Sequence, residues 1–189
     1  IYAYSVDEDN NMDTEGDREL FIQTYRFADH KTGTPIRITN NNVSDAAPQL
    51  IWDYNSNLYL FWLEDGNTVR YLNLTDVLKA NAVQNAVFGN ESEWAPSKVS
   101  VRDENGEDTA ISNFRVYVDE GIILLAFPQT NEYGDGVDIF VTGYSPEDDR
   151  HDGNIGSWSN PQILTHGGEI NELPVMTVLN DGKVMMVNN

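Results

Sequence analysis

A threefold internal repeat constrains the fold of this chain more than any other feature of the sequence. A Pro-x-x-x-Thr/Ser motif recurs at Pro35–Thr39, Pro96–Ser100 and Pro161–Thr165. The prolines stand 61 and 65 residues apart. Because similar motifs at a fixed period are the signature of repeat architectures, we expect three structurally similar units.

Two further motifs accompany each copy of the proline motif. A strand-like segment precedes it, at Glu19–Tyr25, Val69–Leu74 and Asp138–Tyr144. Two strand-like segments follow it, the second starting ten residues after the first, at Pro48 and Leu58, Asn113 and Ile123, and Pro174 and Val184. The turns between these last two segments contain Ser56, Gly121 and Gly182. Small residues that tolerate positive φ at such places are typical of β-hairpins.

Each unit therefore has four strands separated by polar turns, which predicts an all-β fold, a β-propeller of about three four-stranded antiparallel blades. The chain is expected to form a single propeller segment over residues 1–189, with approximate units 1–57, 58–122 and 123–189. The segment Leu58–Trp62 is apolar at every position, so we expect both of its faces to be covered. A helical pattern over Thr75–Val87, capped by Thr75 or Asp76, indicates an insertion in the middle unit.

Both ends of the chain align with the same apolar strand. Ile1–Ser5 and Val184–Asn188 each match Leu58–Trp62. Three blades cannot close a ring, and long apolar edges would remain open to aggregation. We therefore expect a partial propeller, with further blades in a longer chain, or half of a six-bladed ring that a second copy completes.

The repeat resembles bacterial surface and secreted β-propeller repeat proteins, whose architecture is similar to that of sialidases. The residues that carry the resemblance are Tyr2–Asp7, Asp17–Phe21, Asp45–Leu50 and Leu58–Trp62. The resemblance implies a protein outside the cell or on the bacterial surface. The Ser-x-Asp-x-Gly-x-x-Trp box of sialidases is absent, and the arginines occupy unrelated repeat positions. Sialidase activity is therefore not expected.

Composition excludes several classes of partner. With 31 acidic and 11 basic residues the formal net charge is −20, which opposes binding to nucleic acid and to anionic lipid. No apolar run approaches the roughly 20 residues of a membrane-spanning helix, so no membrane insertion is expected. The chain has no cysteine, which excludes disulfides and thiolate chemistry.

The segment 7–17 is the candidate metal site. Oxygen-bearing side chains alternate along it, at Asp7, Asp9, Asn11, Asp13 and Asp17. Calcium prefers six to eight oxygen ligands supplied by such a curled acidic segment, so these residues are candidate calcium ligands. The other interpretation is a solvated acidic hairpin loop, because Met12 and Arg18 stand where an EF-hand has glycine and glutamate.

Catalytic signatures are weak. Neither Gly-x-Ser-x-Gly nor His-Glu-x-x-His occurs. Four acids have repeat positions suited to a central channel, although turn and capping roles are the alternative: Asp45, Asp53, Glu64 and Glu172. The four tryptophans are expected to pack within blades, with stacking on sugar rings as the other interpretation: Trp52, Trp62, Trp94 and Trp158.

These observations favour a non-catalytic propeller segment that binds glycan or protein ligands, with calcium as a possible stabilising ion. The alternative is part of a propeller-fold glycan-active hydrolase, a glycoside hydrolase whose catalytic carboxylates lie in the channel or in blades outside this chain. The sequence leaves the catalytic residues unknown and points to no organic cofactor.

Overall fold

The computed structural model describes residues 1–9, 11, 18–75, 77–79, 96–99, 101, 108–119, 121–130, 134, 136–144, 158–165, 175–178 and 184–187. The chain forms two compact units, one of Ile1–Leu50 with Asn57–Lys98 and one of Ile51–Ser56 with Val99–Asn189. No helix among the described residues is long and apolar enough to cross a membrane.

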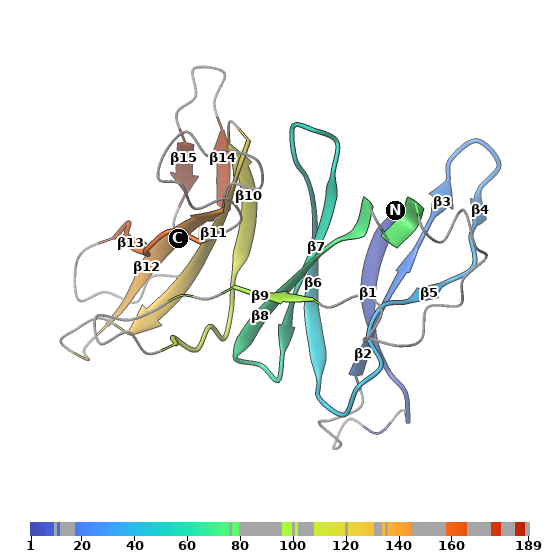
Figure 1. Ribbon diagram of the computed structural model, residues 1–189, viewed down its shortest axis with the longest axis horizontal. Coiled ribbons are helices and arrows are strands. Elements are labelled where there is room, and N and C mark those ends of the chain that lie inside the picture. Colours follow the sequence, from blue (N-terminus) through green and yellow to red (C-terminus); the bar gives the residue numbers. More distant parts are fainter. Residues whose placement is uncertain are drawn as a thin grey trace. The chain divides into compact units, whose positions relative to one another are not determined.

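Most strands of the first unit belong to two antiparallel sheets (Figure 1). The first sheet has the order β1-β2-β5, with β1 at Tyr2–Asp7, β2 at Arg18–Gln23 and β5 at Ile36–Arg37. The second has the order β6-β7-β8-β9, with β6 at Asp45–Trp52, β7 at Leu58–Glu64, β8 at Thr68–Asn73 and β9 at Ser97–Lys98. A separate two-stranded hairpin of β3 (Tyr25–Arg26) and β4 (Lys31–Thr32) lies between β2 and β5 in the chain.

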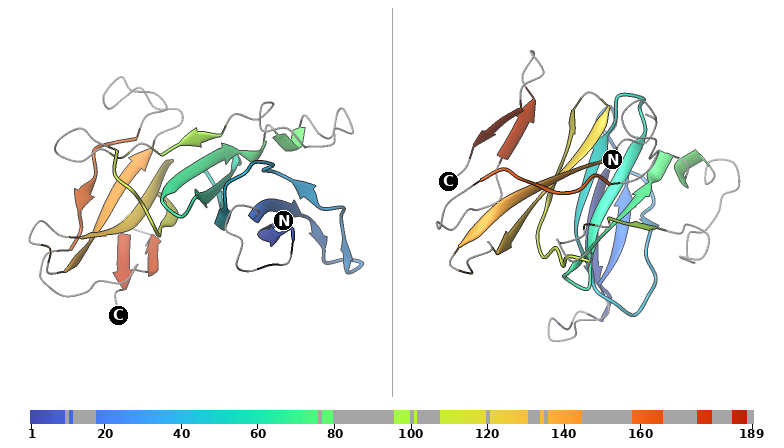
Figure 2. Two further views of the ribbon diagram at one scale, coloured as in Figure 1. Left: turned by 90° about the horizontal axis from the view of Figure 1, so that it is seen from below. Right: turned by 60° about the vertical axis from the view of Figure 1, so that its left-hand side comes forward.

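The second unit repeats this plan. Its four-stranded sheet has the order β10-β11-β12-β13, with β10 at Arg115–Asp119, β11 at Ile122–Thr130, β12 at Val137–Tyr144 and β13 at Gln162–Ile163. A further antiparallel pair joins β14 (Val175–Val178) to β15 (Val184–Val187). Figure 2 shows the sheet of β10 to β13 with the twist usual for β-sheets.

Strand order follows chain order in both four-stranded sheets, as it does in a propeller blade. The predicted all-β propeller fold, with four-stranded antiparallel blades, is confirmed. The middle repeat unit, residues 58–122, contains β7, the second strand of one four-stranded sheet, through β10, the first strand of the other.

Strand β7 is buried on both faces, as its sequence predicts. Leu58, Leu60 and Trp62 point to one face and are at most 1% exposed. They form a core cluster with residues of β2, Leu20 and Ile22, and with Ile38, Leu74 and Val77. The cluster packs the two sheets of the first unit together.

A stacked pair of aromatic rings recurs in three sheets. The pairs are Tyr4 with Phe21, Phe61 with Tyr71, and Phe127 with Phe140. Each pair joins directly opposed residues of neighbouring strands, with ring centroids 6.0, 5.5 and 5.8 Å apart. Such cross-strand pairs contribute roughly 0.5–1.5 kcal/mol each beyond the area that they bury. The pairing is therefore a common structural element of the repeat.

The threonine of the proline motif extends the hydrogen-bond ladder beyond the short edge strand. After β5, the Ile38 amide donates to the Leu20 carbonyl at 2.7 Å, and the Leu20 amide donates to Thr39 Oγ1 at 2.9 Å. After β13, Leu164, Ile139 and Thr165 repeat these bonds at 2.8 and 2.9 Å. The hydroxyl thus takes the place of a backbone carbonyl where the edge strand has ended. Ser100, the third copy, lies outside the described residues.

The turn and cap positions predicted from the sequence are confirmed only in part. Ser56 and Gly121 have φ of 62° and 89°, as predicted for the two hairpins, while Gly182 lies outside the described residues. The predicted helix cap is wrong by two or three residues. Asn73 is the cap, because its Oδ1 accepts the Thr75 amide at 3.0 Å, and Thr75 Oγ1 instead accepts the Leu58 amide at 2.6 Å. Helical residues are described at 74, 75 and 77–79 only.

Thr39→Val tests the role of the motif threonine. Valine keeps the shape of the side chain but leaves the buried Leu20 amide without an acceptor. We expect the free energy of unfolding, measured by urea denaturation, to fall by about 2 kcal/mol.

Thr39→Ser is the matched control, because serine retains the hydroxyl. It should lose at most about 1 kcal/mol, the scale of one small buried group. Equal losses in the valine and serine variants would assign the effect to the methyl group and refute the hydrogen-bond role.

Candidate functional site

The predicted calcium ligands are only partly within the described residues. Asp7 ends β1, and Asp9 Oδ1 accepts the backbone amide of Asn11 at 2.7 Å, which forms a local turn. Asp13 and Asp17 lie outside the described residues. Among the residues that are described, no group of three or more acidic or histidine side chains is placed to hold a metal ion. Calcium binding therefore remains a prediction.

Asp45 is the acid with the most unusual environment. It is the first residue of β6 and is completely buried. Trp62 Nε1 donates to its Oδ1 at 2.6 Å, and Asn41 Nδ2 donates to its Oδ2 at 3.1 Å. Burial and the nearby carboxylate of Glu19 raise the pKa of Asp45 from 3.8 to about 7, although hydrogen bonds from Thr39 and Trp62 oppose the rise.

Glu19 and Arg37 continue this polar network. Glu19 is 1% exposed, and its Oε1 accepts the Asn41 amide at 2.9 Å and lies 3.1 Å from Arg37 Nη2. Arg37 Nη1 also lies 2.9 Å from Glu8 Oε1, and its Nε donates to the Thr39 carbonyl at 2.7 Å. One guanidinium therefore pairs with two carboxylates and is hydrogen-bonded to the end of the proline motif.

Two of the other three acids with predicted channel positions make local contacts in the structure. Asp53 Oδ1 accepts the Asn55 amide at 2.9 Å within the turn between β6 and β7. Glu64 pairs with Arg70 at 2.7 Å on the neighbouring strand. Glu172 lies outside the described residues. Asp53 therefore has the predicted turn role, whereas Glu64 forms a cross-strand ion pair, which the sequence did not predict.

The tryptophans divide into buried and exposed. Trp62 is 1% exposed and Trp158 is half-buried against Tyr144, with ring centroids 5.3 Å apart, so packing within sheets is confirmed for both. Trp94 lies outside the described residues. For Trp52 the prediction is wrong, because this residue ends β6 and is 58% exposed.

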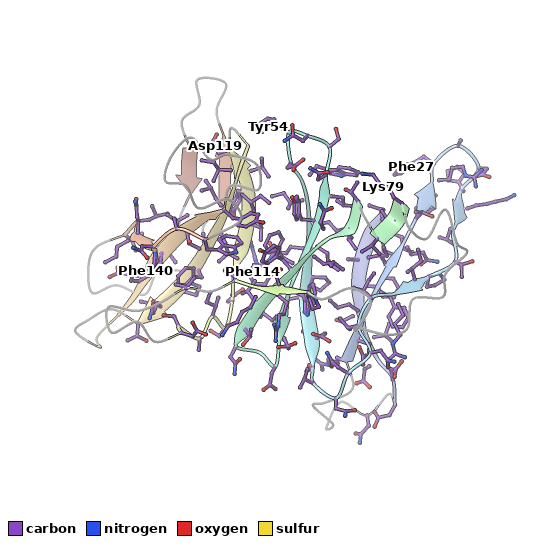
Figure 3. All side chains as sticks on the ribbon, viewed as in Figure 1. Phe27, Tyr54, Lys79, Phe114, Asp119 and Phe140 are labelled. Atoms are coloured by element: carbon purple, nitrogen blue, oxygen red, sulfur yellow. The ribbon has the colours of Figure 1, made fainter. Side chains whose placement is uncertain are left out.

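Among the residues that the structure describes, the most exposed aromatic side chain lies on the hairpin of β3 and β4, residues 25–32. Phe27 follows β3 and is 83% exposed (Figure 3). The Tyr25 ring meets it edge to face, with centroids 5.0 Å apart at 88°. On its other side Tyr25 is hydrogen-bonded through its hydroxyl to His30 Nδ1 at 2.8 Å. The three rings form an aromatic cluster on a protruding turn.

Two hydrogen bonds close this hairpin at its base. The Gly33 amide donates to the Thr24 carbonyl at 2.9 Å, and Gln23 Nε2 donates to the Gly33 carbonyl at 2.7 Å. A Cβ on residue 33 would collide with the Thr24 hydroxyl, which explains the glycine. His30 turns the chain with a φ of 55°. Hydrogen bonds that close the base of a turn reduce the entropy lost when its side chains bind a ligand.

The hairpin also differs in charge from the rest of the chain. Arg26 and Lys31 face each other across it, and Asp29 lies 3.6 Å from Arg26 and 3.9 Å from Lys31. Two basic side chains and one acidic side chain leave a net positive charge on this segment of a chain with a net charge of −20. The combination of aromatic and basic groups makes it the candidate ligand-binding site.

The interpretation of the sequence did not include this site. The available signal is the run Tyr25-Arg-Phe-Ala-Asp-His-Lys31, with two aromatic and two basic residues in a chain that holds 11 basic residues in 189. The repeat alignment obscures it, because Tyr25 matches Tyr144 and is then assigned to the end of a strand.

Comparisons with known proteins are sparse. No protein-family model matches the sequence, and no curated protein matches it. Among solved structures the chain is similar to an endo-arabinase from Bacteroides thetaiotaomicron VPI-5482, with 14% sequence identity and a TM-score of 0.48. The similarity covers 94% of this chain and 72% of that one. A likeness of this size carries no argument about activity, and the sialidase-like architecture remains a prediction.

Asp45→Asn tests the charge state of the buried carboxyl. Below about pH 4 the group is protonated in both the folded and the unfolded chain. Between pH 4 and 7 only the folded chain retains the proton, so protonation of Asp45 favours the folded state. This stabilisation decreases as the pH rises and is lost above about pH 7. The change is on the order of 4 kcal/mol at about 1.4 kcal/mol per pKa unit.

We expect the Asn variant to lose this part of the pH dependence when unfolding free energies are measured from pH 4.5 to 8. Asp65→Asn, which removes an exposed acid, should retain the wild-type slope. Parallel curves for wild type and Asp45→Asn would show that Asp45 titrates normally.

Proposed function

We propose that this chain is a non-catalytic propeller segment that binds a glycan or protein ligand through the hairpin of β3 and β4. The observation that carries the proposal is the 83% exposure of Phe27 on a held turn. An exposed large apolar ring, supported by Tyr25 and flanked by charged groups, is typical of binding surfaces. Phe27 has no role in the hydrophobic core cluster of the first unit.

The burial of Asp45 supports a binding role without catalysis. The most perturbed carboxyl, Asp45, is completely buried and accepts hydrogen bonds from Trp62 and Asn41. A general acid or base must come within hydrogen-bonding reach of its substrate, and this carboxyl is enclosed by protein groups.

The second candidate is part of a propeller-fold glycan-active hydrolase. One observation favours it, because the pKa of about 7 for Asp45 lies in the range that suits a general acid at neutral pH. This candidate requires a conformational change that exposes Asp45, or catalytic residues in blades beyond this chain.

Location and assembly follow from the proposed role. A propeller segment that binds glycans or proteins suits the bacterial surface or the extracellular space. Its sheet edges would be completed by further blades of a longer chain or by a second copy, because unpaired strand edges favour aggregation. Calcium held by Asp7, Asp9, Asn11, Asp13 and Asp17 would stabilise the folded chain.

Phe27→Ala tests the binding role. We expect it to reduce the affinity for the ligand at least about tenfold, because central aromatic residues dominate binding energies. The measurement is a screen of labelled protein on glycan and peptide arrays, followed by titration calorimetry on each hit. The unfolding free energy should change by less than about 0.5 kcal/mol, since the side chain is exposed.

Trp52→Ala is the matched control, because it removes another exposed aromatic ring from a different hairpin. It should leave the affinity unchanged. Loss of binding in Trp52→Ala with retention in Phe27→Ala would refute the proposed site. Turnover of aryl glycosides that disappears in Asp45→Asn would refute the non-catalytic role and favour the hydrolase.

A chelator tests the calcium proposal. A ligand that binds only the folded chain raises its melting temperature, so EDTA should lower Tm by several degrees and added calcium should restore it. Asp9→Asn should reduce this shift, whereas Asp65→Asn should not. An unchanged Tm on chelation would leave the segment as a solvated acidic loop.

A further inference from the structure

We infer that the free edge of β1 is a binding site for an extended polypeptide strand, of the kind that forms the first strand of each four-stranded sheet. The bound strand pairs antiparallel with β1 and completes the first sheet as a blade. This inference rests on the part of the proposed function that concerns assembly, and the hairpin of β3 and β4 has no role in it. Its basis is the position of β1 in its sheet and the composition of the β1 edge.

Strand β1 corresponds to the second strand of a blade. The stacked pair of Tyr4 and Phe21 joins β1 to β2, just as the two other stacked pairs join β7 to β8 and β11 to β12. In the four-stranded sheets a first strand, β6 or β10, lies on the other side of β7 or β11. Among the described strands, β1 is paired with β2 alone. One added strand would therefore give the first sheet the same number of strands as the sheet of β6 to β9, against which it packs.

The other edges of the three larger sheets carry features that discourage pairing. The outer strands β5, β9 and β13 have two residues each. The inner strand β6 contains Pro48, which directly follows Ala47 with a φ of 52°. The inner strand β10 has a charged residue at each end, Arg115 and Asp119. Short strands, prolines, backbone irregularities and charges are the means by which proteins keep sheet edges from pairing.

The edge of β1 has none of these features between Tyr2 and Val6. The strand is six residues long, and Tyr2–Val6 contains no proline and no charged side chain. No residue of β1 has a positive φ. In an antiparallel pair every second residue directs its N–H and C=O away from its partner, so β1 presents a regular row of backbone donors and acceptors. Such a row is the template on which a peptide adds as a further strand.

The surroundings of β1 specify the chemistry of the bound strand. On one face of the sheet, Ala3 packs against the core cluster of the first unit, as does Leu50 of β6. On the other face, Tyr2 and Tyr4 stack with ring centroids 5.7 Å apart. Side chains of a strand alternate between the two faces, so a strand beside β1 places alternate residues next to each of these apolar surfaces. The partner is therefore a segment with apolar or aromatic residues at its centre, and β10, Arg-Val-Tyr-Val-Asp, has this composition.

The test is a titration of the chain with synthetic peptides that copy two of its own first strands, residues 113–119 and 173–179. We expect both peptides to bind in calorimetry with a Kd below about 1 mM. Amide hydrogen exchange within Tyr2–Asp7 should become slower when a peptide is bound, because the free amides of the edge gain acceptors. Failure of both peptides to bind at about 1 mM, or protection that excludes Tyr2–Asp7, would refute the site.

N-methylation of the peptide separates backbone pairing from side-chain contact. Two versions of the 113–119 peptide carry methyl groups on complementary sets of alternate amides. Only one set faces β1, so one version should bind at least about tenfold more weakly and the other should bind like the unmodified peptide. Equal affinities of the two versions would contradict strand addition.

Ser5→Lys tests the edge of β1 itself. Ser5 is exposed and lies on the same face as Ala3, so a lysine there would have its charge covered by an added strand. We expect it to weaken peptide binding at least about tenfold while the urea midpoint of the free chain stays at its wild-type value. Ser97→Lys, an exposed serine of β9, is the matched control and should bind the peptides like wild type.

Phe27→Ala distinguishes this inference from the proposed binding function of the hairpin. It should leave peptide binding unchanged, because Phe27 lies outside β1. Peptide binding that is lost in Phe27→Ala and retained in Ser5→Lys would assign the peptides to the hairpin and refute the β1 site. An array ligand that is lost in Phe27→Ala, with no peptide bound, would refute this inference and leave the proposed function intact. A dimer of the chain that the peptides dissociate, and that Ser5→Lys does not form, would support the site with a second copy as the donor.

Discussion

The hydroxyl of Thr39 is the contact on which the first unit depends. It accepts the Leu20 amide at the point where β5 has ended, and it is hydrogen-bonded to Asp45 at the start of β6. One side chain thus completes the backbone ladder of the first sheet and joins it to the second. Asp45 in turn accepts Trp62 Nε1 on β7, so the polar junction adjoins the apolar core cluster that includes Leu20 and Trp62. Because buried polar groups are costly when unpaired, each member of the network requires the others.

The hydrogen-bonded network around Thr39 and Asp45 also determines which acidic side chains are buried and which side chains remain exposed to a ligand. It encloses Asp45 and Glu19, which are 0% and 1% exposed, and the paired guanidinium of Arg37 lies beside them. Of the four acids with predicted channel positions, the three that the structure describes, Asp45, Asp53 and Glu64, are held by protein groups. The hairpin of β3 and β4 has the opposite character, because its aromatic and basic side chains are exposed and none belongs to the core cluster. The core contacts and the proposed ligand-binding residues thus lie in different segments of the first unit.

Sequence periodicity was sufficient to predict the strands of the four-stranded sheets, their antiparallel order and the buried strand Leu58–Trp62, but not the hairpin of β3 and β4. It could not predict register. Arg37 stands opposite Phe21 and Ile163 opposite Phe140, each two residues after its proline, whereas Ser97 stands opposite Tyr71 only one residue after Pro96. A shift of one residue reverses which side chains face the core, and it depends on tertiary contacts that a motif does not record.

The candidate site escaped prediction for a related physical reason. A comparison of the three units detects only the segments that recur in all of them. The hairpin lies in a connection between strands whose sequence does not recur. The chain between the last two strands of each sheet contains residues 24–35 in the sheet of β1, 74–96 in the sheet of β6 and 145–161 in the sheet of β10. These connections differ in length and composition, while the strands that flank them retain the stacked aromatic pair. Side chains in a strand must satisfy pairing and burial together, whereas a connection is constrained only at its ends. Residues selected for a ligand are therefore expected in these connections, and Tyr25, Phe27 and Arg26 lie in the first of them.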